Sequence, residues 1–267
     1  MAKDPNEINQ RQKEFYDSKK KNLATRGWSY FRNGILNKTR KNIGVEKEIL
    51  DLHTSWFGDL SSKKVLDLGC YEGNSLSFYL AQNSKEYIAI DLSEIGIKKL
   101  SARLKQIPSA RALTIDFLSS DFREKDFDII YAYGVLHHFK DVENLIKRLK
   151  DKLSSNGKII SYDPLETSIP IKIVRSIYRP FQSDRAWEWP FSKKVYYLFD
   201  EAFKIKERRA ILGKAKWFFI IDLMPVSLEK KKEIVRKWHI EDWEKSQASD
   251  SYMFGCMHLT MLMQKKT

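Results

Sequence analysis

The stretch VLDLGCYEGNSL, residues 65–76, runs from an apolar strand pattern directly into a turn of small residues. A dinucleotide-binding fingerprint requires three glycines, so that the backbone can approach a pyrophosphate at a helix N-terminus. Here the three positions hold Gly69, Tyr71 and Asn74, so two of them depart from the fingerprint. A phosphate loop is also excluded, because no lysine and hydroxyl pair follows Gly73. The loop is therefore expected to hold a nucleoside without a pyrophosphate.

Two sequence periods alternate around this loop. Short apolar runs predict strands over residues 64–68, 86–90, 112–115, 127–133 and 157–162. Between them lie helical patterns, for which Ser93 and Asp141 are the expected N-caps and Gly157 the expected stop of the second helix. This alternation predicts an open, doubly wound α/β fold, with ligands at the carboxyl ends of parallel strands.

Two later apolar runs, residues 203–212 and 252–263, are expected to be strands that pair antiparallel at one edge of the sheet. The pattern divides the chain into four regions. They are an N-terminal helical cap over 1–55, a ligand-binding core over 56–163, a lid or substrate insert over 164–202, and the completion of the core sheet with further helices over 203–267.

The composition favours a protein of the reducing cytoplasm. Cys70 and Cys256 stand alone without Cys-x-x-Cys spacing, so neither a disulfide framework nor a zinc site is indicated. The N-terminus lacks the apolar stretch of a secretory signal, and the run WFFIIDLMP, interrupted by Asp222, is too short to span a bilayer.

The net charge of +13 is concentrated in the flanks of the chain. Residues 1–50 carry 12 Lys or Arg against 6 Asp or Glu, and residues 204–237 carry 11 against 4. Such flanks attract an anionic substrate, RNA or an anionic membrane face, and the alternative is that they are solvated helix faces.

Acidic residues end three successive predicted strands. Asp67 ends the first and Asp91 the second, 22 residues beyond Gly69, where the acid of an adenosine-binding βαβ unit accepts hydrogen bonds from ribose hydroxyls. Asp116 ends the third and precedes Phe117, which places a carboxylate for an exocyclic amine beside an aromatic face. The alternatives are a simple turn at Asp67 and a core position for Phe117.

Four motifs in this order resemble those of the class I S-adenosylmethionine-dependent methyltransferases, over roughly residues 62–165: KVLDLGCYEGN, IAIDLSE, TIDF and FDIIYAYGVLHHF. The family usually has glycine where this chain has Tyr71. The resemblance implies a Rossmann-like, mostly parallel seven-stranded sheet with helices on both faces and a helical lid. It also implies S-adenosylmethionine as cofactor, S-adenosylhomocysteine as product, and no metal.

By that resemblance, the contacts with the cofactor come from the strand ends. The methionine part would meet Asp67, Gly69, Cys70, Tyr71 and Gly73; the ribose would meet Asp91; the adenine would meet Asp116 and Phe117; and Tyr133 and Gly134 would flank the sulfonium. Leu92, directly after Asp91, is also expected to contact the cofactor.

Methyl transfer to a hydroxyl also needs a proton acceptor. His137 and His138 follow the fourth predicted strand and Asp163 the fifth, so these three are the candidates, with His138 preferred. In the resembled family the histidine in LHH often only shapes the pocket, and the alternative for Asp163 is a cap or turn residue before Pro164. The other histidines are expected to be structural: His53, His239 and His258.

Residues 163–192 resemble the insert of a methyltransferase subgroup, in which Arg185, Glu188 and Pro190 fit the usual spacing and Trp187 stands where an acid is usual. Three arginines of the insert are candidates to clamp a carboxylate or phosphate: Arg175, Arg179 and Arg185. The alternative is a surface pair of Arg185 with Glu188. Tyr16 is a candidate lid contact near the start, with core packing as its alternative.

The resemblance therefore predicts an enzyme that methylates a small-molecule or sugar-like acceptor, an anionic one included, with O-methylation as its most concrete form. Three alternatives stay open: an RNA methyltransferase that uses the basic flanks, a membrane-docked enzyme with a lipid-linked acceptor, and a catalytically silent S-adenosylmethionine-binding protein.

Overall fold

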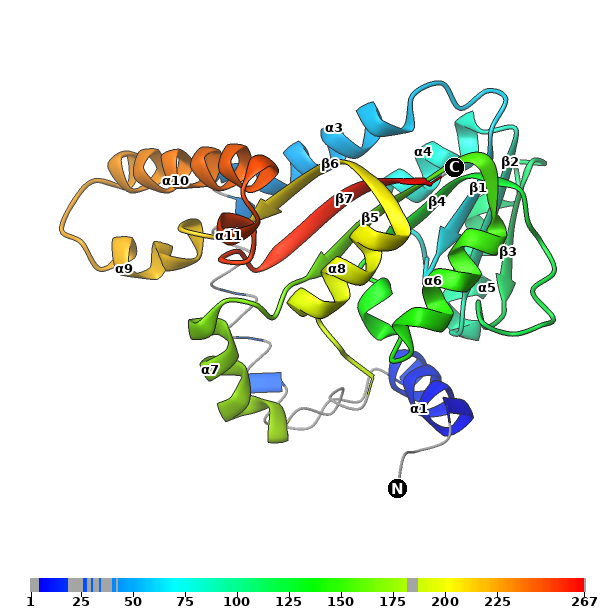
Figure 1. Ribbon diagram of the computed structural model, residues 1–267, viewed down its shortest axis with the longest axis horizontal. Coiled ribbons are helices and arrows are strands. Elements are labelled where there is room, and N and C mark those ends of the chain that lie inside the picture. The colour runs from blue at the N-terminus through cyan, green and yellow to red at the C-terminus, as the bar shows by residue number, and fades with distance from the viewer. Residues whose placement is uncertain are drawn as a thin grey trace.

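The computed structural model describes residues 5–18, 26–27, 30, 34, 40–41, 43–181 and 187–266. Within them, seven strands form one sheet in the order β3-β2-β1-β4-β5-β7-β6 (Figure 1). Strands β1 to β5 run parallel, and β7 pairs antiparallel with both β5 and β6. This confirms the predicted fold class and its antiparallel edge. The strands are β1 (Lys64–Leu68), β2 (Glu86–Asp91), β3 (Ala110–Thr114), β4 (Phe127–Tyr133), β5 (Leu153–Pro164), β6 (Phe203–Ile211) and β7 (His258–Lys265).

Helices cover both faces of this sheet: α3 (Val45–Phe57), α4 (Ser75–Asn83) and α5 (Glu94–Leu104) on one face, and α6 (Val142–Lys152) and α8 (Lys193–Ala202) on the other. The first face packs against Leu80 and Leu100, and the second against Leu149 and Phe199, all fully buried. Burial of such side chains on both faces is what holds a parallel sheet between two helical layers.

The other helices are α1 (Pro5–Ser18), α7 (Ile169–Tyr178), α9 (Phe218–Asp222), α10 (Leu228–Ala248) and α11 (Asp250–Met253), with short 3₁₀ helices η1 (Leu136–His138), η2 (Arg179–Phe181) and η3 (Ala215–Trp217). Of these, α10 packs against β6 at the edge of the sheet. No described helix is both long and apolar enough to cross a bilayer.

The predicted helix starts are confirmed, but the predicted stop of α6 is wrong. The Ser93 hydroxyl accepts from the Gly96 amide at 3.0 Å, and Asp141 accepts from the Asn144 amide at 3.0 Å. The helix ends at Lys152, and Gly157 instead lies inside β5, where a Cβ would come 2.7 Å from the Phe127 carbonyl oxygen. Its lack of a side chain therefore serves strand packing rather than a helix stop.

The last predicted strand begins later than its apolar pattern indicated. Ser249 caps the short helix α11 by accepting from the Tyr252 amide at 3.2 Å, and β7 starts only at His258. A cap with its local hydrogen bond outweighs the strand preference of the residues around Tyr252.

Candidate active site

The loop after β1 has a left-handed backbone at three positions. The φ angles of Gly69, Tyr71 and Gly73 are 69°, 47° and 78°. The Gly69 amide donates to the Ile90 carbonyl at 2.8 Å, which fastens the loop to the end of β2. A Cβ on Gly69 would lie 2.2 Å from Val135 Cγ2, so the loop backbone passes directly against the segment that follows β4. The loop therefore joins the ends of three neighbouring strands.

Tyr71 keeps the glycine-like backbone at the position where glycine is usual. A left-handed conformation costs a non-glycine residue about 1–2 kcal/mol. The Tyr71 amide donates to Asp91 Oδ2 at 2.9 Å, and its ring lies against Gly96 of α5, where a Cβ would be 2.6 Å from Tyr71 Cδ2. The missing side chain at Gly96 provides the space for the ring, so the departure leaves the shape of the loop intact.

The three predicted acids lie at the ends of β1, β2 and β3, which are neighbours in the sheet. Asp67 is 2% exposed and accepts from the Tyr87 hydroxyl at 2.7 Å, and burial raises its pKa to about 6. Asp91 accepts through its second oxygen from the Ser93 amide at 2.8 Å, and burial raises its pKa as well. Asp116 accepts from the Leu118 amide at 2.9 Å.

Three further residues predicted at the cofactor differ in their surroundings. Leu92 is half-buried directly after Asp91. Phe117 is 2% exposed, with its ring centroid 6.0 Å from that of Phe122, so its packing supports the core alternative. Burial and the nearby carboxylates raise the pKa of Cys70 well above its usual value, which disfavours the thiolate form.

An aromatic stack follows the end of β4. The ring centroids of Tyr133 and Tyr162 are 4.8 Å apart, and those of Tyr162 and His258 are 5.4 Å apart with nearly parallel planes. Arg40 Nη2 lies 3.2 Å from His258 Nε2. Gly134, with φ 72°, has no atom within 4 Å of the position that a Cβ would take, so its backbone borders open space beside the stack.

Sequence reasoning missed the part that Tyr162, His258 and Arg40 take in this stack. Tyr162 had a signal, because it closes the fifth predicted strand at the edge where ligands bind. His258 needed the topology: β7 runs antiparallel and pairs His258 with Pro164, which brings the first residue of the strand to that same edge. Arg40 had no signal in the sequence.

His137 and Asp163 form a buried pair. His137 Nδ1 lies 2.9 Å from Asp163 Oδ1, and the His137 amide donates to the same oxygen at 3.2 Å. Burial disfavours both charged forms: it lowers the pKa of His137 to about 3 and raises the pKa of Asp163 to about 7. His137 is therefore neutral at neutral pH, and Asp163 is a residue of β5 rather than of a turn.

His138 is half-buried, and its ring is oriented by the insert. Its Nδ1 lies 2.8 Å from the Trp187 carbonyl oxygen. Because a carbonyl only accepts, Nδ1 carries the proton, and Nε2 of the neutral ring carries the lone pair. The Trp189 amide donates to the His137 carbonyl at 2.8 Å, so the same segment of the insert holds both histidines.

Helix α1 contacts both the cofactor side and the insert. The Ser93 hydroxyl donates to Asp17 at 2.5 Å, and Lys13 pairs with Glu94 at 2.5 Å. The ring of Phe15 lies 5.4 Å from that of Trp187. The position of α1 supports a lid at this place, although the side chain of the predicted contact, Tyr16, lies outside what the structure describes.

Two of the three predicted arginines converge on one carboxylate. Arg175 and Arg179 each place a guanidinium nitrogen 3.5 Å from Glu166 Oε2, and Arg179 also donates to the Glu188 carbonyl at 3.2 Å. Arg185 lies outside the described residues. The pair carries one more positive charge than Glu166 balances.

A metal site and a separate groove were the other possible functional features among the described residues. Among the described side chains, no group of three or more His, Cys, Asp or Glu is arranged to hold a metal ion. A groove of about 470 Å³ lies between α3 and α10, and none of the candidate site residues lines it.

Comparison with known proteins gives the family. A family model described as a methyltransferase domain matches residues 42–207. An uncharacterized protein of Haemophilus influenzae is 32% identical over 134 residues, which are 47% of this chain and 52% of the relative. A tRNA U34 carboxymethyltransferase of Pseudoalteromonas atlantica is 28% identical over 102 residues, 38% of this chain and 32% of the relative. The chain thus spans about half or less of the length of these relatives.

A solved structure shares the fold. It is the N-methyltransferase NodS of Bradyrhizobium japonicum WM9 in complex with S-adenosyl-L-homocysteine, with a TM-score of 0.53 and 16% identity, covering 83% of this chain and 87% of that chain. The family match extends over more than half of the sequence and includes all four motifs. The chain therefore belongs to the methyltransferase domain family and has the fold of the class I S-adenosylmethionine-dependent methyltransferases, as its motifs predicted.

Proposed function

We propose that the protein transfers a methyl group from S-adenosylmethionine to a hydroxyl of a small-molecule or sugar-like acceptor, with His138 as the general base. The observation that carries this proposal is the contact of His138 Nδ1 with the Trp187 carbonyl, which fixes the tautomer and leaves Nε2 as the basic nitrogen. A histidine oriented in this way by its other nitrogen is a typical general base.

The described residues fit the cofactor. Each oxygen of Asp91 accepts one amide and retains a further lone pair for a ribose hydroxyl. Asp116 would accept from the adenine amine, and the open space at Gly134 leaves room for the sulfonium. When bound, S-adenosylmethionine supplies a methyl carbon that its sulfonium already activates, so the protein mainly has to orient the reactants and remove a proton.

The two histidines would have different roles when the proton is removed. His138 Nε2 would take the hydroxyl proton as the acceptor oxygen bonds to the methyl carbon and the carbon–sulfur bond breaks, with S-adenosylhomocysteine as the leaving product. His137 is buried and neutral beside Asp163, and its ring centroid lies 4.1 Å from that of His138. It would act as a positioning residue.

The acceptor would lie between α1, the insert and the aromatic stack. The flat faces of Tyr133, Tyr162 and His258 suit the apolar face of a sugar ring. The positive charge that Glu166 leaves unbalanced on Arg175 and Arg179 suits a carboxylate or phosphate on the acceptor.

Mass spectrometry of a panel of hydroxylated small molecules, incubated with donor that carries a deuterated methyl group, tests the reaction. His138→Gln should lower kcat by about 100-fold or more while calorimetry shows unchanged affinity for S-adenosylmethionine. Lys140→Gln, on the exposed side of the same segment, is the matched control and should keep wild-type kcat. A His138→Gln enzyme with nearly normal kcat would refute the role of His138.

RNA is the second candidate acceptor, favoured by the basic flanks and by the name of the relative from Pseudoalteromonas atlantica. Phosphate contacts release counterions, so RNA binding would weaken steeply between about 50 and 200 mM salt. Incorporation of the deuterated methyl into tRNA at physiological salt would replace the small-molecule assignment, and label in the small molecules alone would support it.

A further inference from the structure

Large apolar side chains are exposed mainly in two short segments. Of the fourteen that are exposed among the described residues, ten lie within residues 169–181 and 217–228. Leu223 is 84% exposed and Ile169 72%. We call the ten together the α7–α9 surface: Ile169, Ile173, Ile177, Phe181, Trp217, Ile220, Leu223, Met224, Val226 and Leu228.

The two segments adjoin each other in space. Lys216, directly before Trp217, donates to the Ser168 hydroxyl at 3.3 Å, and Ser168 is the N-cap of α7. The same ammonium group donates to the Gly255 carbonyl at 2.6 Å. In Figure 1, α7 and α9 lie on the opposite side of the view from β3. The exposed side chains therefore belong to one end of the molecule.

Helix α7 has an apolar face and a basic face. Ile169, Ile173 and Ile177 recur every four residues and so share one face, whereas Arg175 lies on the other. Arg175 pairs with Glu166 at 3.5 Å and its charge contributes to the lowered pKa of His137, so the basic face is turned toward the candidate active site.

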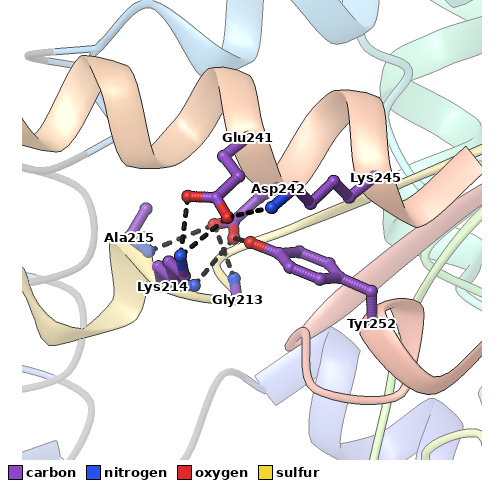
Figure 2. Close-up of polar contacts among 7 residues, drawn as sticks. All are labelled: Gly213, Lys214, Ala215, Glu241, Asp242, Lys245 and Tyr252. Carbon is purple, nitrogen blue, oxygen red and sulfur yellow. Dashed lines mark hydrogen bonds and ion pairs between the residues drawn. The ribbon is translucent and has the colours of Figure 1, made fainter. Parts of the chain in front are cut away.

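A buried carboxylate fixes the entry to η3 and α9. Asp242 of α10 accepts from the amides of Gly213, Lys214 and Ala215 at 2.8, 2.7 and 3.1 Å, and from the Tyr252 hydroxyl at 3.1 Å (Figure 2). These bonds tie the chain after β6 to α10 and α11. The part of the α7–α9 surface that lies on η3 and α9 is therefore held in place by these hydrogen bonds.

The charge around the surface selects among occupants. Residues 165–181 and 214–232 together contain eight Lys or Arg against three Asp or Glu; Arg175 faces the candidate active site, whereas Lys172, Lys230 and Lys232 are exposed. A second copy of the same surface would bring like charges together, whereas an anionic bilayer offers the opposite charge to the lysines and an apolar boundary to the side chains. Apolar residues beside lysines are the pattern of interfacial membrane binding.

We propose that the α7–α9 surface docks on the face of an anionic lipid bilayer, with its apolar side chains in the headgroup boundary and its lysines at the lipid phosphates. Docking there would hold the insert side of the active site at the membrane. The proposal goes beyond the proposed methyl transfer and does not depend on which atom is methylated.

Co-sedimentation of the full chain with vesicles of phosphatidylcholine containing 30 mol% phosphatidylglycerol tests the docking, with pure phosphatidylcholine vesicles as reference. Wild type should bind the anionic vesicles, and Ile173→Glu with Leu223→Glu should weaken that binding at least tenfold. Ile95→Glu with Ile240→Glu is the matched control, because both are exposed apolar residues, at 45% and 41%, outside the α7–α9 surface. This control variant should bind as wild type does.

A second variant tests the electrostatic part. Lys172→Gln, Lys230→Gln and Lys232→Gln together should weaken binding severalfold and reduce its dependence on salt. Absence of wild-type binding to the anionic vesicles, or equal loss in the control variant, would overturn the proposal. A dimer in lipid-free solution that the Ile173→Glu and Leu223→Glu variant dissociates would overturn it in favour of a second copy. The affinity for S-adenosylmethionine is measured on the same samples. A variant that keeps the wild-type affinity is folded and binds the donor, so its loss of vesicle binding is a loss of docking alone.

Discussion

Gly69 and Gly134 have almost the same φ angle but different surroundings. Alanine substitutions at the two positions therefore separate the cost of a left-handed backbone from the cost of a steric clash. Gly134→Ala should lose about 1–2 kcal/mol of unfolding free energy, the cost of a left-handed alanine. Gly69→Ala adds a Cβ that would lie 2.2 Å from Val135 Cγ2, and it should lose about 2 kcal/mol more. Urea unfolding of both variants gives the comparison. Equal losses would show that the loop relaxes away from Val135, and Val135→Ala should partly restore the Gly69→Ala protein.

Asp67 makes stability depend on pH in an unusual direction. Burial raises its pKa to about 6 from an ordinary value of 3.8, so the folded protein keeps this proton where the unfolded chain has lost it. The resulting stability is present below pH 4 and is lost as the pH rises through 6, by about 3 kcal/mol in all, because a tenfold difference in proton affinity is worth about 1.4 kcal/mol. Asp67→Asn does not titrate, and its oxygen can still accept from Tyr87. The stability of this variant relative to wild type should therefore increase by most of that amount between pH 4 and 7 in denaturant titrations, and parallel profiles would contradict the assignment.

The His137–Asp163 pair does not produce a similar slope near pH 5. At that pH, between the ordinary pKa values of 3.8 and 6.5, the unfolded chain carries one proton on His137, and the folded pair carries one on Asp163. The number of bound protons is then equal in the two states, so folding stability does not change with pH on account of this pair.

Among the elements, α1 is held to the start of α5 by polar contacts of two of its side chains. Asp17 contacts Ser93 and Lys13 contacts Glu94, both at the start of α5. Asp17→Ala should speed hydrogen exchange in residues 5–18 and weaken the affinity for S-adenosylmethionine severalfold, because a cover that opens more often leaves the ligand more exposed. Glu14→Ala is the matched control, since Glu14 bonds within the helix to Gln10. A change of equal size in the control would argue against a covering role for α1.

Much of the element pattern could be predicted from the sequence, because period and caps are local properties. The strand at 64–68 has its predicted bounds, and Ser93 and Asp141 cap their helices as expected. Gly157 and the residues near Tyr252 were misassigned, because tertiary packing decides the first and a local cap the second. Phe117 was ambiguous for a similar reason: its neighbours in the core come from other segments.

In the C-terminal part of the molecule, Asp242 of α10 joins the chain after β6 to α11. It is fully buried and accepts from three backbone amides and a tyrosine hydroxyl. Asp242→Asn replaces one acceptor oxygen by a donor that faces amides, so it should lower the unfolding free energy by about 2–4 kcal/mol. Glu241→Gln, which loses only surface pairs with Lys214 and Lys245, should lose less than about 1 kcal/mol. Urea unfolding of the two variants measures the difference, and a similar loss in both would show that the Asp242 contacts contribute little.

The topology of the molecule was predictable, but the aromatic stack beside β4 was not. Alternating strands and helices restrict the order of a parallel sheet, so the three acids at its edge could be inferred from their positions along the chain. The stack of Tyr133, Tyr162 and His258 with Arg40 depends on residues more than 200 positions apart. No local pattern encodes such a contact.

The packing of the Tyr71 ring against Gly96 makes the residue types at these two positions depend on each other. A tyrosine at position 71 is tolerated only while position 96 lacks a side chain, whereas a glycine at 71 would permit alanine at 96 and a better helix there. A side chain can therefore enter position 96 only when position 71 has lost its ring. The two positions are coupled, and a scan for the loop glycines alone would overlook the glycine at 96 that makes room for the tyrosine.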